Sequence, residues 1–191
     1  NGLKTDDIFD LVRRLRVDLT IPLAFMTYAN VVFSYGPDRF ARTAAEAGID
    51  GLILPDVPFE EKDTFAPACR AQGLDFISLI APTSRDRISR IAREAEGFVY
   101  CVSSLGVTGT RSRITTDVAT MVELVRAANP DIPCAVGFGI STPEQAREMA
   151  QVADGVIVGS AIMERVGQYG TESVQPVADY IRQMKDAIRG L

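Results

Sequence analysis

Apolar residues along this chain follow two patterns that alternate from one end to the other. In the first, apolar residues recur at i, i+3, i+4 and i+7, as in Ile8, Leu11, Val12 and Leu15, and predict helices packed on a core through one face. In the second, short apolar runs such as Gly51–Pro55 resemble parallel strands buried on both faces. The alternation predicts an α/β protein with a parallel sheet and helices outside it.

Six strands are expected, each followed by at least one helix. The strands cover Ile21–Tyr28, Gly51–Pro55, Phe76–Ile80, Phe98–Val102, Cys134–Val136 and Gly155–Val158. The helices cover Thr5–Val17 and Pro37–Ala47, surround Phe65–Cys69, Ile88–Ala95 and Val118–Val125, start at Ser141 or Thr142 and after Ser160, and end with the stripe Val174, Val177, Ile181, Met184 and Ile188. Glycines at Gly48, Gly73 and Gly97 end three of these helices.

The order of elements, one helix and then six βα units, fits two architectures. An open doubly wound sheet accommodates six units, whereas a closed (β/α)8 barrel needs eight, typically ~250 residues. The 191 residues open on a helix with no preceding strand and no initiator Met. We therefore expect a single domain over residues 1–191, the C-terminal part of a TIM barrel, with roughly 60–70 residues of its first two βα units upstream.

The composition excludes several classes of function. A net charge of −5 and a pI of about 4.8 give no electrostatic basis for binding nucleic acid or an anionic membrane. No apolar run approaches the ~20 residues of a membrane span. The three cysteines lack the spacing of metal ligands, so buried thiols in a reducing cytoplasm are expected. The sequence has no histidine, which excludes Ser-His-Asp and Cys-His catalysis and argues against a metal site.

The segment Cys134–Ile162 carries the strongest chemical signal. Its two apolar runs end in small residues that open helices, at Gly137–Ser141 and at Gly159–Ala161. Glycine lets backbone N–H groups approach a ligand, and a helix start offers unpaired N–H groups at a positive dipole end. Two consecutive turns of this kind resemble the phosphate site formed after strands 7 and 8 of (β/α)8 barrels.

The same glycines have two other interpretations. They could serve only as tight turns, which is the usual role of a single glycine-rich turn. Alternatively, Gly137, Gly139 and Thr142 resemble a damaged GxGxxG dinucleotide fingerprint, but its third glycine is missing and Asp154 precedes a strand instead of ending one. The presence of two adjacent turns favours phosphate.

Five motifs resemble the tryptophan synthase alpha chain family from its third βα unit onward. They occur in family order and at family spacing, and the resemblance covers essentially all 191 residues. The motifs are Pro22–Asn30 (PLAFMTYAN), Ala47–Glu61 (AGIDGLILPDVPFEE), Ser104–Gly109 (SLGVTG), Gly137–Pro143 (GFGISTP) and Gly159–Ile162 (GSAI). The Pro-Asp-x-Pro and Gly-Val-Thr-Gly loops separate this family from other phosphate-binding barrels.

The resemblance implies a lyase of tryptophan biosynthesis. The family cleaves indole-3-glycerol phosphate to indole and glyceraldehyde 3-phosphate by a retro-aldol reaction without cofactor or metal. Indole then passes to a beta chain that holds pyridoxal phosphate, within an alpha-beta-beta-alpha complex. The implied roles are phosphate binding for Gly109, Gly139, Gly159 and Ser160; an indole pocket for Tyr28, Ile53, Tyr100, Thr108 and Phe138; and a beta-chain interface for Asn30, Asp56 and Pro58.

The resemblance also places the catalytic residues outside this sequence. The family's Glu and Asp lie on and just after its second strand, upstream of Asn1, and nothing here matches that stretch. Retro-aldol cleavage needs a base and an acid, so we expect no catalytic residue on this chain and no turnover by it. Asp56, which stands tight against a strand end, is the acid–base candidate from the residues alone, whereas the resemblance places it at the beta-chain interface.

Several alternatives stay open at this point. Tyr28 and Phe138 are either pocket residues or core aromatics. The loop Ser103–Thr115 has the length of a lid. A second function is that of another phosphate-binding barrel, of the aminoaldose isomerase type, which explains Gly137–Ile162 but not the Pro-Asp-x-Pro loop. A third is a non-catalytic subunit that docks on a beta chain.

Overall fold

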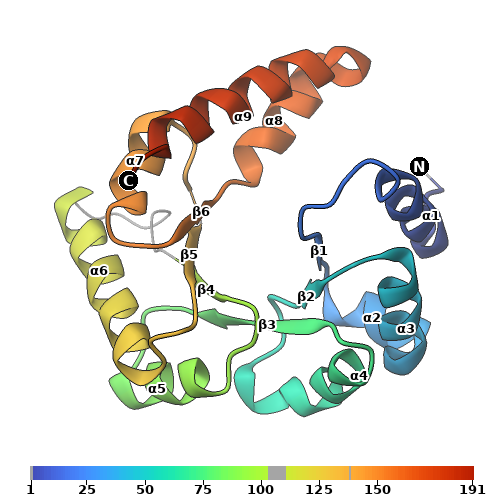
Figure 1. Ribbon diagram of the computed structural model, residues 1–191, viewed down its shortest axis with the longest axis horizontal. Helices are drawn as coiled ribbons and strands as arrows, with labels where there is room; N and C mark the ends of the chain where they lie inside the picture. The colour runs from blue at the N-terminus through green and yellow to red at the C-terminus, as the bar shows by residue number, and fades with distance from the viewer. Residues whose placement is uncertain (1, 103–110, 138) are drawn as a thin grey trace. The chain divides into compact units, whose positions relative to one another are not determined.

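The computed structural model describes residues 2–102, 111–137 and 139–191, with residues 111–117 described by their backbone alone (Figure 1). Contacts divide the chain into two compact units. The first unit is Asn1–Ser78 with Ala95–Gly97, and the second is Leu79–Glu94 with Phe98–Leu191. Each unit has its own parallel strands and its own buried apolar residues.

Strands and helices alternate along the described residues, as predicted. The strands are β1 (Ala24–Met26), β2 (Gly51–Ile53), β3 (Asp75–Ile80), β4 (Val99–Val102), β5 (Cys134–Gly137) and β6 (Gly155–Ile157). The α-helices are α1 (Thr5–Leu15), α2 (Ala29–Tyr35), α3 (Pro37–Ala47), α4 (Ala66–Ala71), α5 (Arg85–Arg93), α6 (Arg111–Ala128), α7 (Pro143–Ala150), α8 (Ser160–Tyr169) and α9 (Val174–Ile188). Two short 3-10 helices are η1 (Phe59–Thr64) and η2 (Gly170–Glu172).

In the first unit, β1, β2 and the start of β3 pair in parallel. Met26 lies beside Ile53, so β1 and β2 end at the same level. Helix α3 packs on α1, α2 and α4. The ring of Phe9 is 5.3–5.6 Å, between centroids, from the rings of Phe25, Tyr35 and Phe40. This aromatic cluster anchors α1 to the unit.

In the second unit, β4, β5 and β6 pair in parallel. Tyr100 lies beside Ala135, and Gly137 lies beside Ile157. Helix α5 packs on α6, and α9 packs on both α7 and α8 (Figure 1). The carboxyl ends of β5 and β6 are therefore adjacent, with α7 and α8 leaving from them and α9 covering both helices.

Four observed strands, β1, β2, β4 and β6, are shorter than predicted, whereas β3 and β5 are each one residue longer. The strand predicted over Ile21–Tyr28 covers only Ala24–Met26, and Tyr28 is the N-cap residue of α2, a helix that the sequence analysis missed. Only Thr27 and Tyr28 separate β1 from α2, and this short connection hid the boundary. Helix α6 begins at Arg111, so the loop predicted over Ser103–Thr115 is wrong for its last five residues, and its first eight lie outside the described residues.

Two predicted helix faces are confirmed only in part. On α1, Ile8, Leu11 and Leu15 are 37–45% exposed, whereas Phe9 and Val12 are buried. On α9, Val174 and Ile181 are exposed, and Tyr180 and Met184 are buried. In both helices an aromatic residue is buried together with a predicted one: Phe9 with Val12, and Tyr180 with Met184. A stripe of aliphatic residues alone therefore predicts the helix but not its buried face.

An acidic residue stands before each of three strands, β2, β4 and β6, and its carboxylate contacts residues that lie earlier in the chain and in the same unit. The carboxylate accepts a backbone N–H near the start of the previous strand in the sequence. It also pairs with an arginine that lies in, or caps, the helix before that previous strand. The three sets of carboxylate, N–H and arginine are Asp50, Leu23 and Arg16; Glu96, Phe76 and Arg70; and Asp154, Cys134 and Arg126. We call each set an acid brace.

The acid braces lie at the amino ends of the strands. Their backbone N–H to carboxylate distances are 2.7 Å at Leu23, 3.5 Å at Phe76 and 2.8 Å at Cys134. Charge-assisted hydrogen bonds of this kind are stronger than neutral ones. The amino ends of these strands therefore carry charged contacts, whereas the carboxyl ends of β5 and β6 carry glycine-rich turns, as in barrels whose stability and chemistry lie at opposite faces.

Candidate functional site

The two glycine-rich turns predicted from the sequence lie at one edge of the second unit. Gly137 ends β5 and pairs with Ile157, which ends β6. Because parallel strands end on the same side, the turns that follow them are neighbours. Gly139, with a φ of +79°, lies in the first turn, and Gly159 and Ser160 lie in the second.

The first turn is closed by its own side chains. Thr142, the N-cap residue of α7, accepts the N–H of Gln145 through Oγ1 at 3.3 Å. In return, Gln145 Oε1 accepts the N–H groups of Ser141 and Thr142 at 2.8 and 3.1 Å. Pro143 has no N–H to offer. The capping signature predicted from the sequence is confirmed, and it occupies donors that an anion would otherwise use.

The second turn has no such cap. Gly159 is the N-cap residue of α8 and gives no side-chain acceptor to the first turn of that helix. A Cβ added to Gly159 would meet nothing within 4 Å in the described part of the chain, and Gly159 and Ser160 are both exposed. A helix start with uncapped N–H groups, a serine hydroxyl and open space suits an anion better than the closed turn does.

Tyr100 on β4 packs across the backbone of Gly137. A Cβ on Gly137 would lie 2.6 Å from both Cε2 and Oη of Tyr100, so only glycine leaves room for the ring. The ring is 6% exposed, and burial raises the pKa of its hydroxyl. The predicted pocket residue Tyr100 therefore lies next to the first turn, and Gly137 gains a packing role that its sequence position did not reveal.

In the first unit, predicted interface residues meet at the carboxyl ends of β1 and β2. Both carboxylate oxygens of Asp56 accept the N–H of Ala29, at 3.0 and 3.1 Å. This fixes the first turn of α2, which carries the exposed Asn30. Tyr28 is 64% exposed, which excludes the interpretation that it is a core aromatic. Pro58 is exposed and precedes η1.

Ile53 is the one buried member of the predicted pocket in this unit, at 7% exposure. It ends β2, and its carbonyl accepts the N–H of Thr27 at 3.1 Å. Three further predicted residues, Thr108, Gly109 and Phe138, lie outside the described residues.

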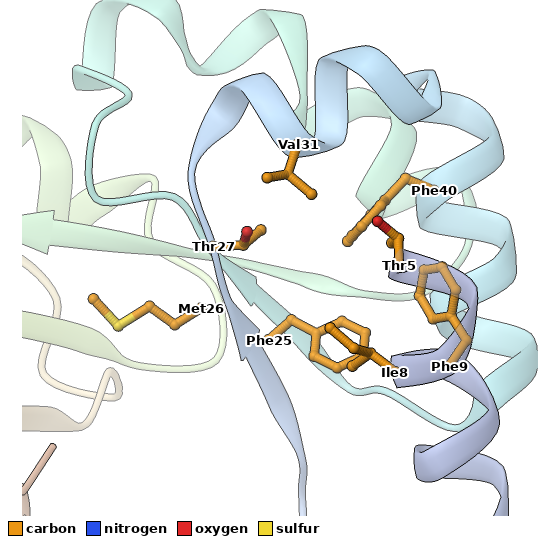
Figure 2. Close-up of a pocket in the computed structure, with 8 residues that line it drawn as sticks. All are labelled: Thr5, Ile8, Phe9, Phe25, Met26, Thr27, Val31 and Phe40. Atoms are coloured by element: carbon orange, nitrogen blue, oxygen red, sulfur yellow. The ribbon is translucent and has the colours of Figure 1, made fainter. Parts of the chain in front are cut away.

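A cavity of about 200 Å³ lies beside α1 and β1 in the first unit. In Figure 2 the side chains of Phe25 and Ile8 lie between β1 and α1, whereas Met26 points to the other side of β1. Its polar groups are the hydroxyls of Thr5 and Thr27, and no titratable side chain lines it. None of the predicted site residues contributes to this cavity, and its lining offers no acid–base chemistry.

The three cysteines are free and buried, as predicted. Burial raises the pKa of Cys69 to about 11, so its thiol stays protonated at neutral pH. The hydrogen bond with Cys134, together with burial, raises the pKa of Cys101. The described residues contain no group of three or more His, Cys, Asp or Glu side chains that could hold a metal ion. None of the helices described is both long and apolar enough to span a membrane.

Comparison with known proteins decides between the functions left open by the sequence. The family model of the tryptophan synthase alpha chain matches residues 1–189. The chain belongs to the tryptophan synthase alpha chain family. The alpha chain of Shouchella clausii is 47% identical over 193 residues, which cover 96% of this chain and 71% of that relative. The chain thus spans about 70% of the length of this relative, and the aminoaldose isomerase alternative is not favoured.

Solved structures of the family agree with the sequence match. Tryptophan synthase subunit alpha from Campylobacter jejuni has a TM-score of 0.86 and 32% identity, covering 96% of this chain and 72% of its own. The tryptophan synthase α2β2 complex from Pyrococcus furiosus has a TM-score of 0.81 and 29% identity, covering 97% and 75%. The predicted fold class is confirmed: six βα units of a (β/α)8 barrel. The predicted enzyme class, a lyase of tryptophan biosynthesis, is confirmed with it.

Proposed function

We propose that this chain binds the phosphate of indole-3-glycerol phosphate at the start of α8. The backbone N–H groups of Gly159 and Ser160 and the Ser160 hydroxyl are the donors. Gly139 lets the neighbouring turn approach the same group, and Gly109 completes the set. The observation that carries the proposal is the uncapped first turn of α8 beside the capped first turn of α7. A phosphate gains both from the helix dipole and from charge-assisted hydrogen bonds.

In this proposal the phosphate is the group by which the chain holds and orients the substrate. Fixing it at the edge of β5 and β6 orients the rest of the molecule, which lowers the entropy cost of the reaction. Tyr100 offers its buried ring to the indole, with Tyr28, Ile53, Thr108 and Phe138 as the other pocket residues. None of these residues supplies the acid or base of the retro-aldol cleavage, so binding is the property that tests the proposal.

We propose that the loops bearing Asn30, Asp56 and Pro58 form the face for a beta chain. The α2β2 complex from Pyrococcus furiosus, whose alpha subunit resembles this chain, supports such a partner. The double hydrogen bond from Ala29 to Asp56 presents Asn30 on a fixed first turn. Pyridoxal phosphate belongs to the beta chain, and this chain needs no cofactor. Three free thiols fit a reducing cytoplasm.

The test compares a charge placed in the site with the same charge placed outside it. In Gly159→Asp the carboxylate caps α8 and repels phosphate, so the affinity for inorganic phosphate falls at least about tenfold while the melting temperature holds or rises. The matched control is Gly167→Asp, near the other end of α8, where an added Cβ also meets nothing within 4 Å. Phosphate binding is measured by ³¹P NMR titration of the 191-residue chain, with indole-3-glycerol phosphate as a second ligand.

Three results would contradict the proposal. The first is the absence of phosphate binding by the unmodified chain. The second is equal phosphate affinity in Gly159→Asp and the unmodified chain. The third is an equal loss in Gly159→Asp and Gly167→Asp, which would trace the effect to net charge instead of to the site.

A further inference from the structure

Tyr180 is a buried residue of α9 that lies far along the sequence from either glycine-rich turn. Its side chain is 4% exposed. Helix α9 packs on both α7 and α8, the two helices that start at those turns (Figure 1). A side chain on the inner face of α9 can therefore contact structures belonging to both turns.

The hydroxyl of Tyr180 reaches the first turn. It donates a hydrogen bond to the carbonyl oxygen of Ser141 at 3.0 Å. Ser141 is also held by Gln145, whose Oε1 accepts from the Ser141 N–H at 2.8 Å and hydroxyl at 3.2 Å. Burial raises the pKa of Tyr180, so its hydroxyl stays protonated and remains a donor at neutral pH.

The ring of Tyr180 reaches the second turn through Arg165 on α8. The guanidinium carbon of Arg165 lies 3.6 Å from the ring centroid, a cation–π distance. The same guanidinium donates through Nη1 to the carbonyl oxygen of Ala161 at 2.9 Å. Ala161 is buried and follows Ser160 directly. Arg165 therefore contacts the first turn of α8 from a position one turn further along the same helix.

We infer that Tyr180 is a positioning residue for the substrate phosphate. Its hydroxyl holds the β5–α7 turn in place through Ser141, and its ring holds the start of α8 in place through Arg165. The inference rests on the proposed function, in which Gly139 and Gly159–Ser160 bind one phosphate. An anion site made of backbone N–H groups works only if the groups converge before the ligand arrives. Because the donors come from two separate turns, a single side chain joined to both reduces the ordering cost of binding.

The test removes the hydroxyl and keeps the ring. In Tyr180→Phe, Ser141 loses its hydrogen bond while the ring can still stack on Arg165. The affinity for inorganic phosphate, measured by ³¹P NMR titration of the 191-residue chain, falls about three- to tenfold. The affinity for indole, which lacks a phosphate, stays within twofold. The matched control is Tyr169→Phe at the exposed end of α8, for which the phosphate affinity is unchanged.

A second variant tests the other contact. Arg165→Met keeps an aliphatic stem against Tyr180 but removes the donor to Ala161, and the phosphate affinity falls by a similar factor. In the double variant with Tyr180→Phe the combined loss differs from the product of the single losses, because both side chains act on one arrangement.

The outcomes separate this inference from the proposed function. If the unmodified chain binds no phosphate, both fail. If Gly159→Asp abolishes phosphate binding and Tyr180→Phe binds it as tightly as the unmodified chain, the inference alone is overturned. Parallel losses of phosphate affinity, indole affinity and melting temperature in Tyr180→Phe would also overturn it, since they indicate general loosening of the fold.

Discussion

The β5–α7 turn and the β6–α8 turn look alike in sequence, yet only one of them leaves its helix start uncapped. In the first, Thr142 and Gln145 take up N–H groups at the start of α7. In the second, the N-cap residue is Gly159, which has no side chain to cap the helix. Two turns that look like a matched pair therefore differ in what they leave open: in the first, side chains close the helix start and leave Gly139 for the proposed phosphate site, whereas in the second the helix start itself is open.

The difference depends on two positions in each helix. The cap position holds a hydroxyl in α7 and nothing in α8, and the third helical residue is Gln145 in α7 but Ile162 in α8. A capping box needs an acceptor at both. The number of glycines therefore does not separate the two turns, whereas the side-chain acceptors at these two positions do.

The largest loss of stability is expected at Gly137, where the β5–α7 turn begins. Gly137→Ala places a methyl group 2.6 Å from the Tyr100 ring, and such overpacking costs about 1–3 kcal/mol in the free energy of unfolding. Gly159→Ala, the equivalent change beside the second turn, costs less than about 1 kcal/mol because the added group meets open space. Urea unfolding of both variants checks the difference. Equal losses would contradict the contrast between a packed turn and an open one.

A smaller effect is expected from removing one hydroxyl in each turn. Thr142→Ala removes the cap of α7 and costs about 1 kcal/mol of stability. Ser160→Ala leaves the unfolding free energy within about 0.5 kcal/mol, because Ser160 is exposed and is not the N-cap residue of α8. Instead it lowers the affinity for inorganic phosphate a few-fold, by roughly one hydrogen bond. Thermal unfolding and ³¹P NMR titration separate the two losses, and a reversal would show that the turns have been assigned the wrong roles.

The smallest effect on stability is expected from the acid brace of Asp154, which joins β5 to β6 at their amino ends. Partial burial opposes ionisation of Asp154, but the N–H of Cys134 and the guanidinium of Arg126 outweigh it and hold the pKa of that carboxyl below its ordinary value. A lowered pKa stabilises the fold above the ordinary carboxyl pKa of about 4, and this contribution is lost as the pH falls through the lower value.

The unmodified chain should therefore lose stability between about pH 5 and pH 3 more steeply than Asp154→Asn. Because the carboxylate is partly exposed, the difference stays near or below about 1 kcal/mol. Unfolding in urea at a series of pH values measures it, with Asp131→Asn on the nearby loop as the control. Identical pH profiles for the unmodified chain and Asp154→Asn would show that the brace contributes nothing measurable to stability.

Features coded by neighbouring residues could be predicted from the sequence. The period of apolar residues placed the helices, Gly48 ended α3 in a left-handed conformation, and Thr142 with Gln145 predicted the capping box. The family resemblance then supplied the roles of residues that the spacing alone left open, such as Asp56.

Features that depend on distant residues could not be predicted in this way. The bond from Tyr180 to Ser141 joins residues 39 apart, and the bonds from Ala29 to Asp56 join residues 27 apart. The aliphatic stripe of α9 pointed to Val174 and Ile181, whereas the packing buried Tyr180. Which face of a helix is buried depends on what lies opposite, and that information is not local.

The acid braces also determine where this chain can be cut. Their spans are 16–50, 70–96 and 126–154, and these do not overlap. A nick within Phe59–Thr64 crosses none of them, whereas a nick within Arg85–Arg93 separates Arg70 from Glu96. Two fragments divided at the first position each keep their braces whole, and the cut that separates them falls inside the first compact unit.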